Sequence, residues 1–318
     1  MSVPTVSVCI VTCNQERYIQ ECLEGVLVQS ADAVLEVLVG DDCSDDRTSS
    51  IVAAVAKEHP NVIVHVRHDP RLGVCANLRS LLLRARGEFI AVLDGDDYWL
   101  PGKLKAQLAY MEMHPECVAV YTNAKTVTES GQAIGLFNDA GNRILDLPGL
   151  LRRGNFLNAS SALLRAGLKQ GLLEIDGPYL DYRAHLLHAR KGTLAQIGQP
   201  LAVYRVNSSG SLVSGSNDFV RKLYWEAIMD VPRDLVSDGD FARGLADFMK
   251  RILFRSLSAK RYALVREWAP RVFEVSPYGR LRMGLLVLGA VARSIYVESR
   301  GRLRAGIDGR AAKVLYRR

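Results

Sequence analysis

The sequence lacks the short patterns that mark several common classes of protein. Its six cysteines form no Cys-x-x-Cys pair and have apolar neighbours, so we expect buried, reduced thiols and neither a zinc site nor a disulfide framework. No Gly-x-Gly-x-x-Gly follows the first apolar run, and no Gly-x-x-x-x-Gly-Lys occurs. A dinucleotide-binding fold and a P-loop are therefore disfavoured.

A long hydrophobic segment is also missing. The most continuous apolar run covers residues 283–292, between Arg282 and Arg293, and falls well short of the ~20 residues that span a bilayer. It predicts either an amphipathic helix at a membrane surface or a helix buried in a C-terminal subdomain. The first five residues carry no basic side chain, so we expect no signal peptide and a cytoplasmic protein.

Positive charge is concentrated in the last third of the chain. Residues 1–220 hold 20 Lys and Arg against 24 Asp and Glu, whereas residues 221–318 hold 21 against 10. This asymmetry predicts an anionic partner for the C-terminal third, either nucleic acid or the inner face of a membrane, and a partner protein is a further alternative. Few aromatic residues lie between the arginines, and we expect no nucleic acid.

Strand and helix patterns alternate through the first third of the chain, which predicts an α/β fold with a mostly parallel sheet. After residue 104 the pattern loosens. Residues 130–158 are rich in Gly and Asn and are expected to be irregular, and a helix is expected at 182–190. From about residue 218 the pattern is helical. The predicted strands are residues 6–11, 35–39, 62–66, 89–93, 118–121, 160–164, 194–197 and 201–204.

Polar residues follow the ends of the first four predicted strands, at the edge where open α/β sheets bind ligands. The densest group is Asp94-Gly95-Asp96-Asp97, with three carboxylates in four positions. Such carboxylates repel one another unless a cation compensates, and Mg²⁺-type ions combine carboxylates with substrate phosphates. The alternative is an acidic turn that caps the next helix. The other strand-end residues are Thr12, Asn14, Asp41, Asp42 and Asp69.

Four motifs, in this order, resemble those of family 2 glycosyltransferases, which have the GT-A fold. Residues 6–14 resemble an opening strand that ends Thr-Tyr-Asn, and residues 41–48 resemble Asp-Asp-x-Ser-x-Asp-x-Thr. Residues 73–77 resemble Gly-x-x-x-Asn, and residues 93–104 resemble the DxD motif with the segment that follows it. The match covers roughly residues 5–210. It implies a catalytic domain at 1–217, with a nucleotide-binding half (1–104) and an acceptor half (105–217), before a basic helical region at 218–318.

The resemblance also implies a nucleotide-sugar donor, expected to be a UDP-sugar, and a Mn²⁺ or Mg²⁺ ion. Asp96 is the expected metal ligand, supported by Asp97. Asp42 is expected to accept from the pyrimidine ring, because a carboxylate suits an N–H donor. Cys13 replaces the usual Tyr and removes a surface for base stacking. The expected donor-binding residues are Thr12, Asn14, Asp41, Asp42, Asn77, Asp94, Gly95 and, on the diphosphate, Arg205.

An inverting transfer needs a general base for the acceptor hydroxyl. The family places it in a Glu-Asp pair at the start of a helix. Here Leu180-Asp181 occupies that position, and Asp181 is the predicted base. The alternatives are that Asp181 only caps its helix and that Asp176 is the base. Residues 154–161 are expected to face the acceptor.

The predicted function is transfer of a sugar to a glycan, a lipid-linked glycan or a glycoprotein in cell-surface polysaccharide synthesis. One alternative is a nucleotidyltransferase, which predicts a Gly-rich basic loop after the first strand that residues 12–17 do not supply. The other is a catalytically silent, nucleotide-binding scaffold that docks through its basic C-terminal region.

Overall fold

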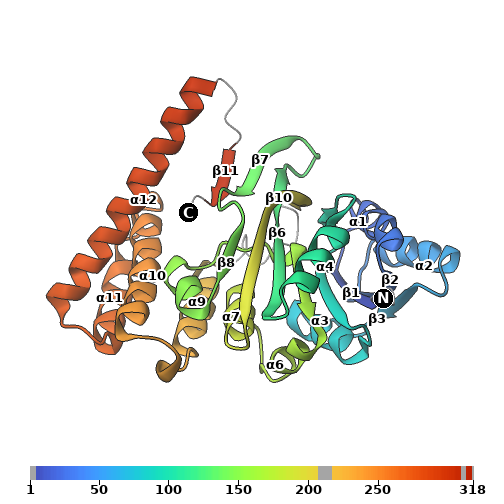
Figure 1. Ribbon diagram of the computed structural model, residues 1–318, viewed down its shortest axis with the longest axis horizontal. Helices are drawn as coiled ribbons and strands as arrows, with labels where there is room; N and C mark the ends of the chain where they lie inside the picture. The colour runs from blue at the N-terminus through green and yellow to red at the C-terminus, as the bar shows by residue number, and fades with distance from the viewer. Residues whose placement is uncertain (1–4, 207–216, 309–312, 317–318) are drawn as a thin grey trace.

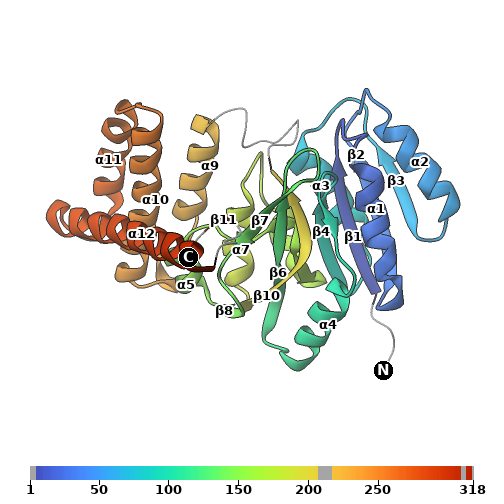
Figure 2. The ribbon, with the colours of Figure 1, turned by 90° about the horizontal axis from the view of Figure 1, so that it is seen from above.

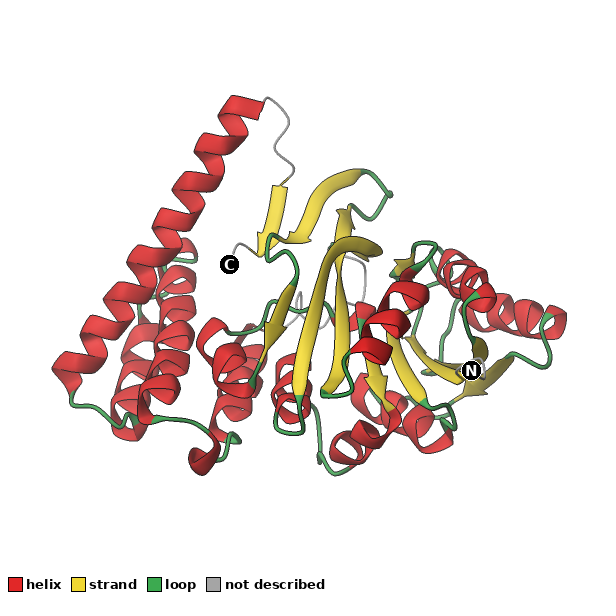
Figure 3. Cartoon of the chain, viewed as in Figure 1, coloured by secondary structure: helices red, strands yellow, loops and turns green. Residues whose placement is uncertain are grey.

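A mixed sheet of 11 strands forms the centre of the molecule, with helices on both faces (Figures 1 and 3). The computed structural model describes residues 5–206, 217–308 and 313–316. Side chains of β1 (Thr5–Thr12) alternate between two hydrophobic clusters, Val8 and Ile10 in one, Cys9 and Val11 in the other. This alternation is expected of a strand that is buried on both faces.

The first half of the sheet is parallel, as predicted. Its strand order is β4-β1-β2-β3, and the register pairs Thr12 with Asp41 and Val11 with Asp94. The carboxyl ends of three strands therefore meet at one edge. These three are β1, β2 (Val34–Asp41) and β4 (Phe89–Asp94), and β3 (Ile63–Arg67) lies next to β2 at the end of the sheet. The helices that connect the four strands along the chain are α1 (Ile19–Leu27), α2 (Thr48–Glu58) and α3 (Val74–Arg84).

The second half of the sheet mixes directions. The long strand β6 (Cys117–Val127) runs parallel to β10 (Thr193–Arg205) and antiparallel to β9 (Leu163–Arg165). β10 replaces the two short strands expected at 194–197 and 201–204, with register shifts around Pro200. The remaining elements here are β5 (Tyr98–Trp99), α4 (Lys103–Met113), α6 (Lys169–Leu173) and α7 (Asp181–Ala189).

The prediction that residues 130–158 are irregular was wrong. They form β7 (Ala133–Asn138), β8 (Arg143–Leu145) and α5 (Leu147–Arg153). The Asn residues that suggested loops are partly structural, because the buried Asn138 bonds through its side chain to Phe156 O and Gln196. A buried amide that satisfies neighbouring polar groups looks like a turn residue in the sequence.

In the part of the chain that the structure describes, four α-helices come after β10 and form the C-terminal region (Figure 2). They are α9 (Asn217–Met229), α10 (Asp238–Ser258), α11 (Ala263–Val275) and α12 (Arg280–Asp308). They share one hydrophobic cluster with α5 and α7, in which Tyr182 stacks on Tyr224 at 4.6 Å. The chain then returns to the sheet as β11 (Lys313–Tyr316), parallel to β7. The boundary at residue 217 stays a prediction.

Helix α12 contains the apolar run and has two distinct faces. Met283 and Val287 are buried against the C-terminal cluster, whereas Leu285 is 61% and Leu288 64% exposed. The run is therefore only half buried. Within the described residues, no helix is both long and apolar enough to cross a membrane. All six cysteines are free, as expected, but only Cys9, Cys22 and Cys117 are buried, and the other three are partly exposed.

Candidate active site

The acidic turn after β4 lies against the end of β1. Gly95 N–H donates to Val11 O at 2.9 Å, which carries the turn beyond the paired strands. A Cβ at Gly95 would lie 2.5 Å from Gln15 Oε1 and 2.8 Å from Thr12 Cβ. Only glycine therefore allows this approach. Gly95 and Thr12 come together as predicted, and Thr12 donates to Gln15 Oε1 at 2.8 Å.

Three carboxylates converge in this turn. One oxygen from each of Asp94, Asp96 and Asp97 lies within 4.8 Å of the others. Burial, followed by the charges of Asp96 and Asp181, raises the pKa of Asp94 to about 8. Burial and the charges of Asp96 and Asp94 likewise raise the pKa of Asp97 well above its ordinary value. Crowded carboxylates with raised pKa values are the environment that a divalent cation relieves.

Asp97 is fixed by the strand that closes the site. Its Oδ1 accepts the backbone N–H of Arg205 in β10 at 2.8 Å. Its Oδ2 is buried, and no partner within the described residues meets hydrogen-bond geometry with it. An oxygen-binding cation would satisfy this atom, so the residues present fit a Mn²⁺ or Mg²⁺ ion.

The structure brings Asp181 to this cluster from a distant part of the sequence. Asp181 is the first residue of α7, and Leu180 in the capping position makes no side-chain cap. The side chain is accessible to solvent, yet the protein around it raises the pKa of its carboxyl above the ordinary value. Its charge contributes to the raised pKa of Asp94, so the two carboxylates act on each other electrostatically. Asp176, the competing base, lies on the exposed loop before α7.

The neighbouring strand end supplies two acids with different surroundings. Asp41 is fully buried, and burial opposes its ionisation. The His65 ring, whose Nε2 lies 3.6 Å from Asp41 Oδ2, and a hydrogen bond from Ser44 N–H outweigh burial and lower the pKa of Asp41 to about 2. Asp42 accepts the backbone N–H groups of Leu72 at 2.6 Å and Gly73 at 2.8 Å. Asp41 is thus a permanent charge beneath the site, and Asp42 shapes the loop that leads into α3.

Asn14 also ties two loops of this edge together. Its N–H donates to Ser44 Oγ at 2.9 Å, and its side-chain oxygen accepts from Asp45 N at 2.8 Å. Its φ of 53° lies in the left-handed region, which Asn tolerates better than most residues. Asn14 therefore holds the loop after β1 against the loop after β2.

Two further predicted donor-binding side chains are also engaged with the protein. Asn77 is buried, donates to Gly40 O at 2.7 Å and lies 3.2 Å from His68 Nε2. Arg205 donates to Asp96 O and, at 3.0 Å, to Glu21. Its guanidinium also bonds to the carbonyls of Thr128 and Glu129. Arg205 braces the acidic turn, and a contact with phosphate would require it to exchange some of these partners.

Sequence reasoning missed two residues at the site. Arg71 donates to Asp42 O at 3.1 Å and Cys43 O at 3.0 Å, and so joins the loops after β2 and β3. Ser160 places its Oγ 3.4 Å from Asp94 N. Ser160 belongs to residues 154–161, which are expected to face the acceptor, but the sequence did not single it out.

The family model for glycosyl transferase family 2 matches residues 7–157, from β1 to the segment before Ser160. Residues 7–157 of this chain therefore form a glycosyl transferase family 2 domain. The predicted family and the GT-A fold are thereby confirmed. The family match includes all four motifs and the acidic turn.

The chain is also similar to individual proteins. An uncharacterised protein of Mycobacterium tuberculosis is 32% identical over 222 residues, which cover 69% of this chain and 63% of that protein. The GalNAc(5)-diNAcBac-PP-undecaprenol beta-1,3-glucosyltransferase of Campylobacter jejuni is 23% identical, with 81% and 85% covered. The crystal structure of S. aureus TarS 1–349 in complex with UDP-GlcNAc has a TM-score of 0.65 at 20% identity, covering 89% and 84%, and this likeness concerns the fold.

Proposed function

We propose that this family member is a metal-dependent, inverting glycosyltransferase that uses a UDP-sugar and acts in cell-surface polysaccharide synthesis. The supporting observation is the convergence of Asp181 with the acidic turn, beside the edge shaped by Asp41 and Asp42. A donor site and a base are the two parts that such a transfer requires. The acceptor is a hydroxyl of a glycan, and the Campylobacter relative's name suggests a lipid-linked one.

In this proposal the residues divide the work. Asp181 takes the proton of the acceptor hydroxyl while that oxygen attacks the anomeric carbon and the bond to the diphosphate breaks. Asp96 and Asp97 would hold Mn²⁺ or Mg²⁺, which supplies charge neutralisation to the leaving diphosphate. Asp94, the first residue of the turn, feels the charge of Asp181 and is proposed to contact the ribose. The loop held by Asp42 and Arg71 forms the edge proposed to receive the base.

The first test separates the base from the donor site. Asp181→Asn should lower transfer by about 10²-fold or more, because general-base catalysis contributes that much. UDP binding should change less than about twofold, because Asp181 is not assigned to the nucleotide. Transfer is measured with Mn²⁺ and a panel of nucleotide sugars, and Asp176→Asn serves as the matched control. Near-normal turnover of Asp181→Asn would remove the assignment. Binding of UDP by the wild type without hydrolysis or transfer of any donor would favour the catalytically silent, nucleotide-binding scaffold.

We also propose that the C-terminal region rests on an anionic membrane surface through α12. Exposed Leu281, Leu285 and Leu288 recur at helical spacing opposite the buried face of the helix. Arg282 and Arg293 lie three turns apart on one flank of this row. An apolar row beside cations suits an interface with anionic lipid. A second copy of the chain would bring like arginines together, which disfavours a symmetric dimer through this face.

Two equally exposed leucines allow a matched test of this location. Leu288 on α12 and Leu83 on α3 are each 64% exposed. Leu288→Glu should weaken binding of the full chain to phosphatidylglycerol vesicles by about tenfold or more, since a leucine contact with the apolar phase is lost. Leu83→Glu should leave this binding unchanged. Equal binding to neutral phosphatidylcholine vesicles, or equal loss in both variants, would contradict the proposal.

A further inference from the structure

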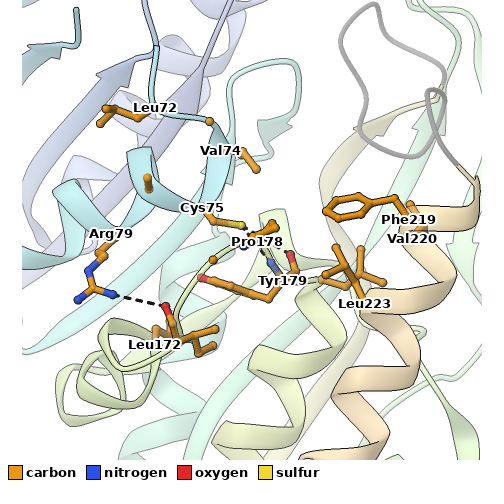
Figure 4. A pocket seen from close by; sticks show the side chains of 15 residues that line it. Leu72, Val74, Cys75, Arg79, Leu172, Pro178, Tyr179, Phe219, Val220 and Leu223 are labelled. Carbon is orange, nitrogen blue, oxygen red and sulfur yellow. Dashed lines mark hydrogen bonds between the residues drawn. The ribbon is translucent and has the colours of Figure 1, made fainter. Parts of the chain in front are cut away.

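An apolar pocket adjoins the proposed active site, between the start of α3 and the loop before α7. Its volume is about 380 Å³, within the usual range of small-molecule sites. Three walls enclose it: the start of α3 with the loop before it, the loop that leads into α7, and α9 (Figure 4). The side chains that face one another across it are Val74, Cys75, Pro178, Tyr179, Phe219 and Leu223.

The pocket shares its walls with both halves of the site. Gly73, at its edge, donates its N–H to Asp42 at 2.8 Å. Leu180, in the opposite wall, directly precedes Asp181. Between them, Cys75 Sγ bonds to Tyr179 O at 3.6 Å, and the charge of Asp181 contributes to the raised pKa of this thiol, after burial. A group in the pocket therefore lies beside the proposed base.

The chemistry of the lining excludes most of the donor. A nucleotide-sugar exposes hydroxyls, phosphates and ring nitrogens, which need polar partners when they are buried. Among the described residues that line the pocket, Arg79 alone is charged, and its guanidinium donates to Ile175 O at 3.4 Å. The remaining side chains offer hydrophobic contact and little hydrogen bonding. Such a surface suits an apolar chain.

We propose that this pocket binds an apolar group of the acceptor, an isoprenoid or acyl chain attached close to the accepting hydroxyl. The inference rests on the proposed function and narrows its acceptor to an amphipathic molecule. Exposed apolar side chains at the rim support it. Phe219 is 42% exposed, and Val74, at the opposite side, is 38% exposed. Removal of this surface from water would contribute to acceptor affinity.

The test uses an apolar fluorescent probe, N-phenyl-1-naphthylamine, with the full chain. Wild type should bind the probe, and monomeric octyl glucoside should displace it while methyl glucoside should not. Phe219→Asp should weaken probe binding by about tenfold, the loss expected for one aromatic contact. The matched control is Phe254→Asp, because Phe254 is 40% exposed on α10 and does not line the pocket; it should bind within about twofold of wild type.

UDP binding, measured in parallel by calorimetry, separates this proposal from the proposed function. A wild type that binds UDP but no probe overturns the pocket assignment alone, and is expected if another segment of the chain fills the pocket. Displacement of the probe by UDP-sugar assigns the pocket to the donor and also overturns it. Equal loss in Phe219→Asp and Phe254→Asp does the same. If the wild type does not bind UDP, the proposed function itself is contradicted.

Discussion

Two glycines let backbone segments around the acidic turn approach more closely than any side chain would allow. Gly25 is inside α1, where a Cβ would lie 2.8 Å from Trp99 O and 3.0 Å from Trp99 N. These are backbone atoms of β5, directly after the turn, so they cannot swing aside. Gly95 is restricted by side-chain atoms instead, Gln15 Oε1 at 2.5 Å and Thr12 Cβ at 2.8 Å from its Cβ position. The position of the carboxylates thus depends on residues that carry no charge.

Gly25→Ala should therefore destabilise the protein, although alanine favours helices. We expect the free energy of unfolding to fall by about 1–3 kcal/mol, the usual effect of overpacking. Gly289→Ala is the matched control, because Gly289 is also helical and has no atom within 4 Å of its Cβ position. It should be neutral or stabilising by up to about 1 kcal/mol. Urea unfolding measures both, and equal effects would show that close packing at Gly25 is unimportant.

For single residues, the sequence predicted positions in the fold better than side-chain contacts. Asp94, Asp96 and Thr12 could be placed at one edge because parallel strands align their carboxyl ends. The internal bonds of Asn77 and Arg205 could not be predicted, since a side chain's partners depend on which distant strand packs beside it. Arg205 reaches the turn only because β10 runs next to β5.

Helix α7 combines the proposed base with two buried histidines. Burial, and then the charge of His188, lowers the pKa of His185 to about 3, while burial lowers the pKa of His188 to about 4. Tyr121 OH lies 2.9 Å from His185 Nδ1. Neither ring nitrogen of His188 has a hydrogen-bond partner within the described residues. Both histidines are thus held neutral against the sheet, and the helix that carries Asp181 is sensitive to acid.

The pH dependence of stability follows from these directions. Unfolded histidine takes up a proton near pH 6.5, whereas His188 in the folded chain does so only near pH 4. Stability is complete above pH 6.5 and is lost as the pH falls toward 4. Wild type should lose about 1.4 kcal/mol per pH unit in this window relative to His188→Gln. The difference between the two proteins cancels the carboxylates, and parallel curves would show that His188 does not titrate on unfolding.

Element prediction succeeded where hydrophobic periodicity was strong and failed where polar groups were buried. The first four strands were predicted close to their observed bounds, because each is a short apolar run. β7, β8 and α5 were missed, since Gly and buried Asn residues hid their patterns. The short strand β11 was also missed; Tyr316 joins the sheet by packing on Phe137, with ring centroids 5.0 Å apart.

Across the whole molecule, one sheet edge collects groups from distant parts of the chain. The acidic turn, the Asp42 loop and the start of α7 meet there, while α9 closes the adjoining apolar pocket. The arginine-rich helices of the C-terminal region, α10, α11 and α12, lie at one end of the molecule, away from β3 (Figure 1). This arrangement separates the proposed chemistry from the proposed membrane contact.

The central claim is that the acidic turn holds a divalent cation against the diphosphate of a nucleotide-sugar. Calorimetry of UDP binding, with Mn²⁺ or with EDTA, tests it most directly without requiring the acceptor. Mn²⁺ should tighten UDP binding by about tenfold or more in the wild type, because the cation links carboxylates to phosphate oxygens. Asp96→Asn should lose this gain and keep the weaker, metal-free binding. Equal UDP affinity with and without Mn²⁺, or an unchanged Mn²⁺ effect in Asp96→Asn, would contradict the claim.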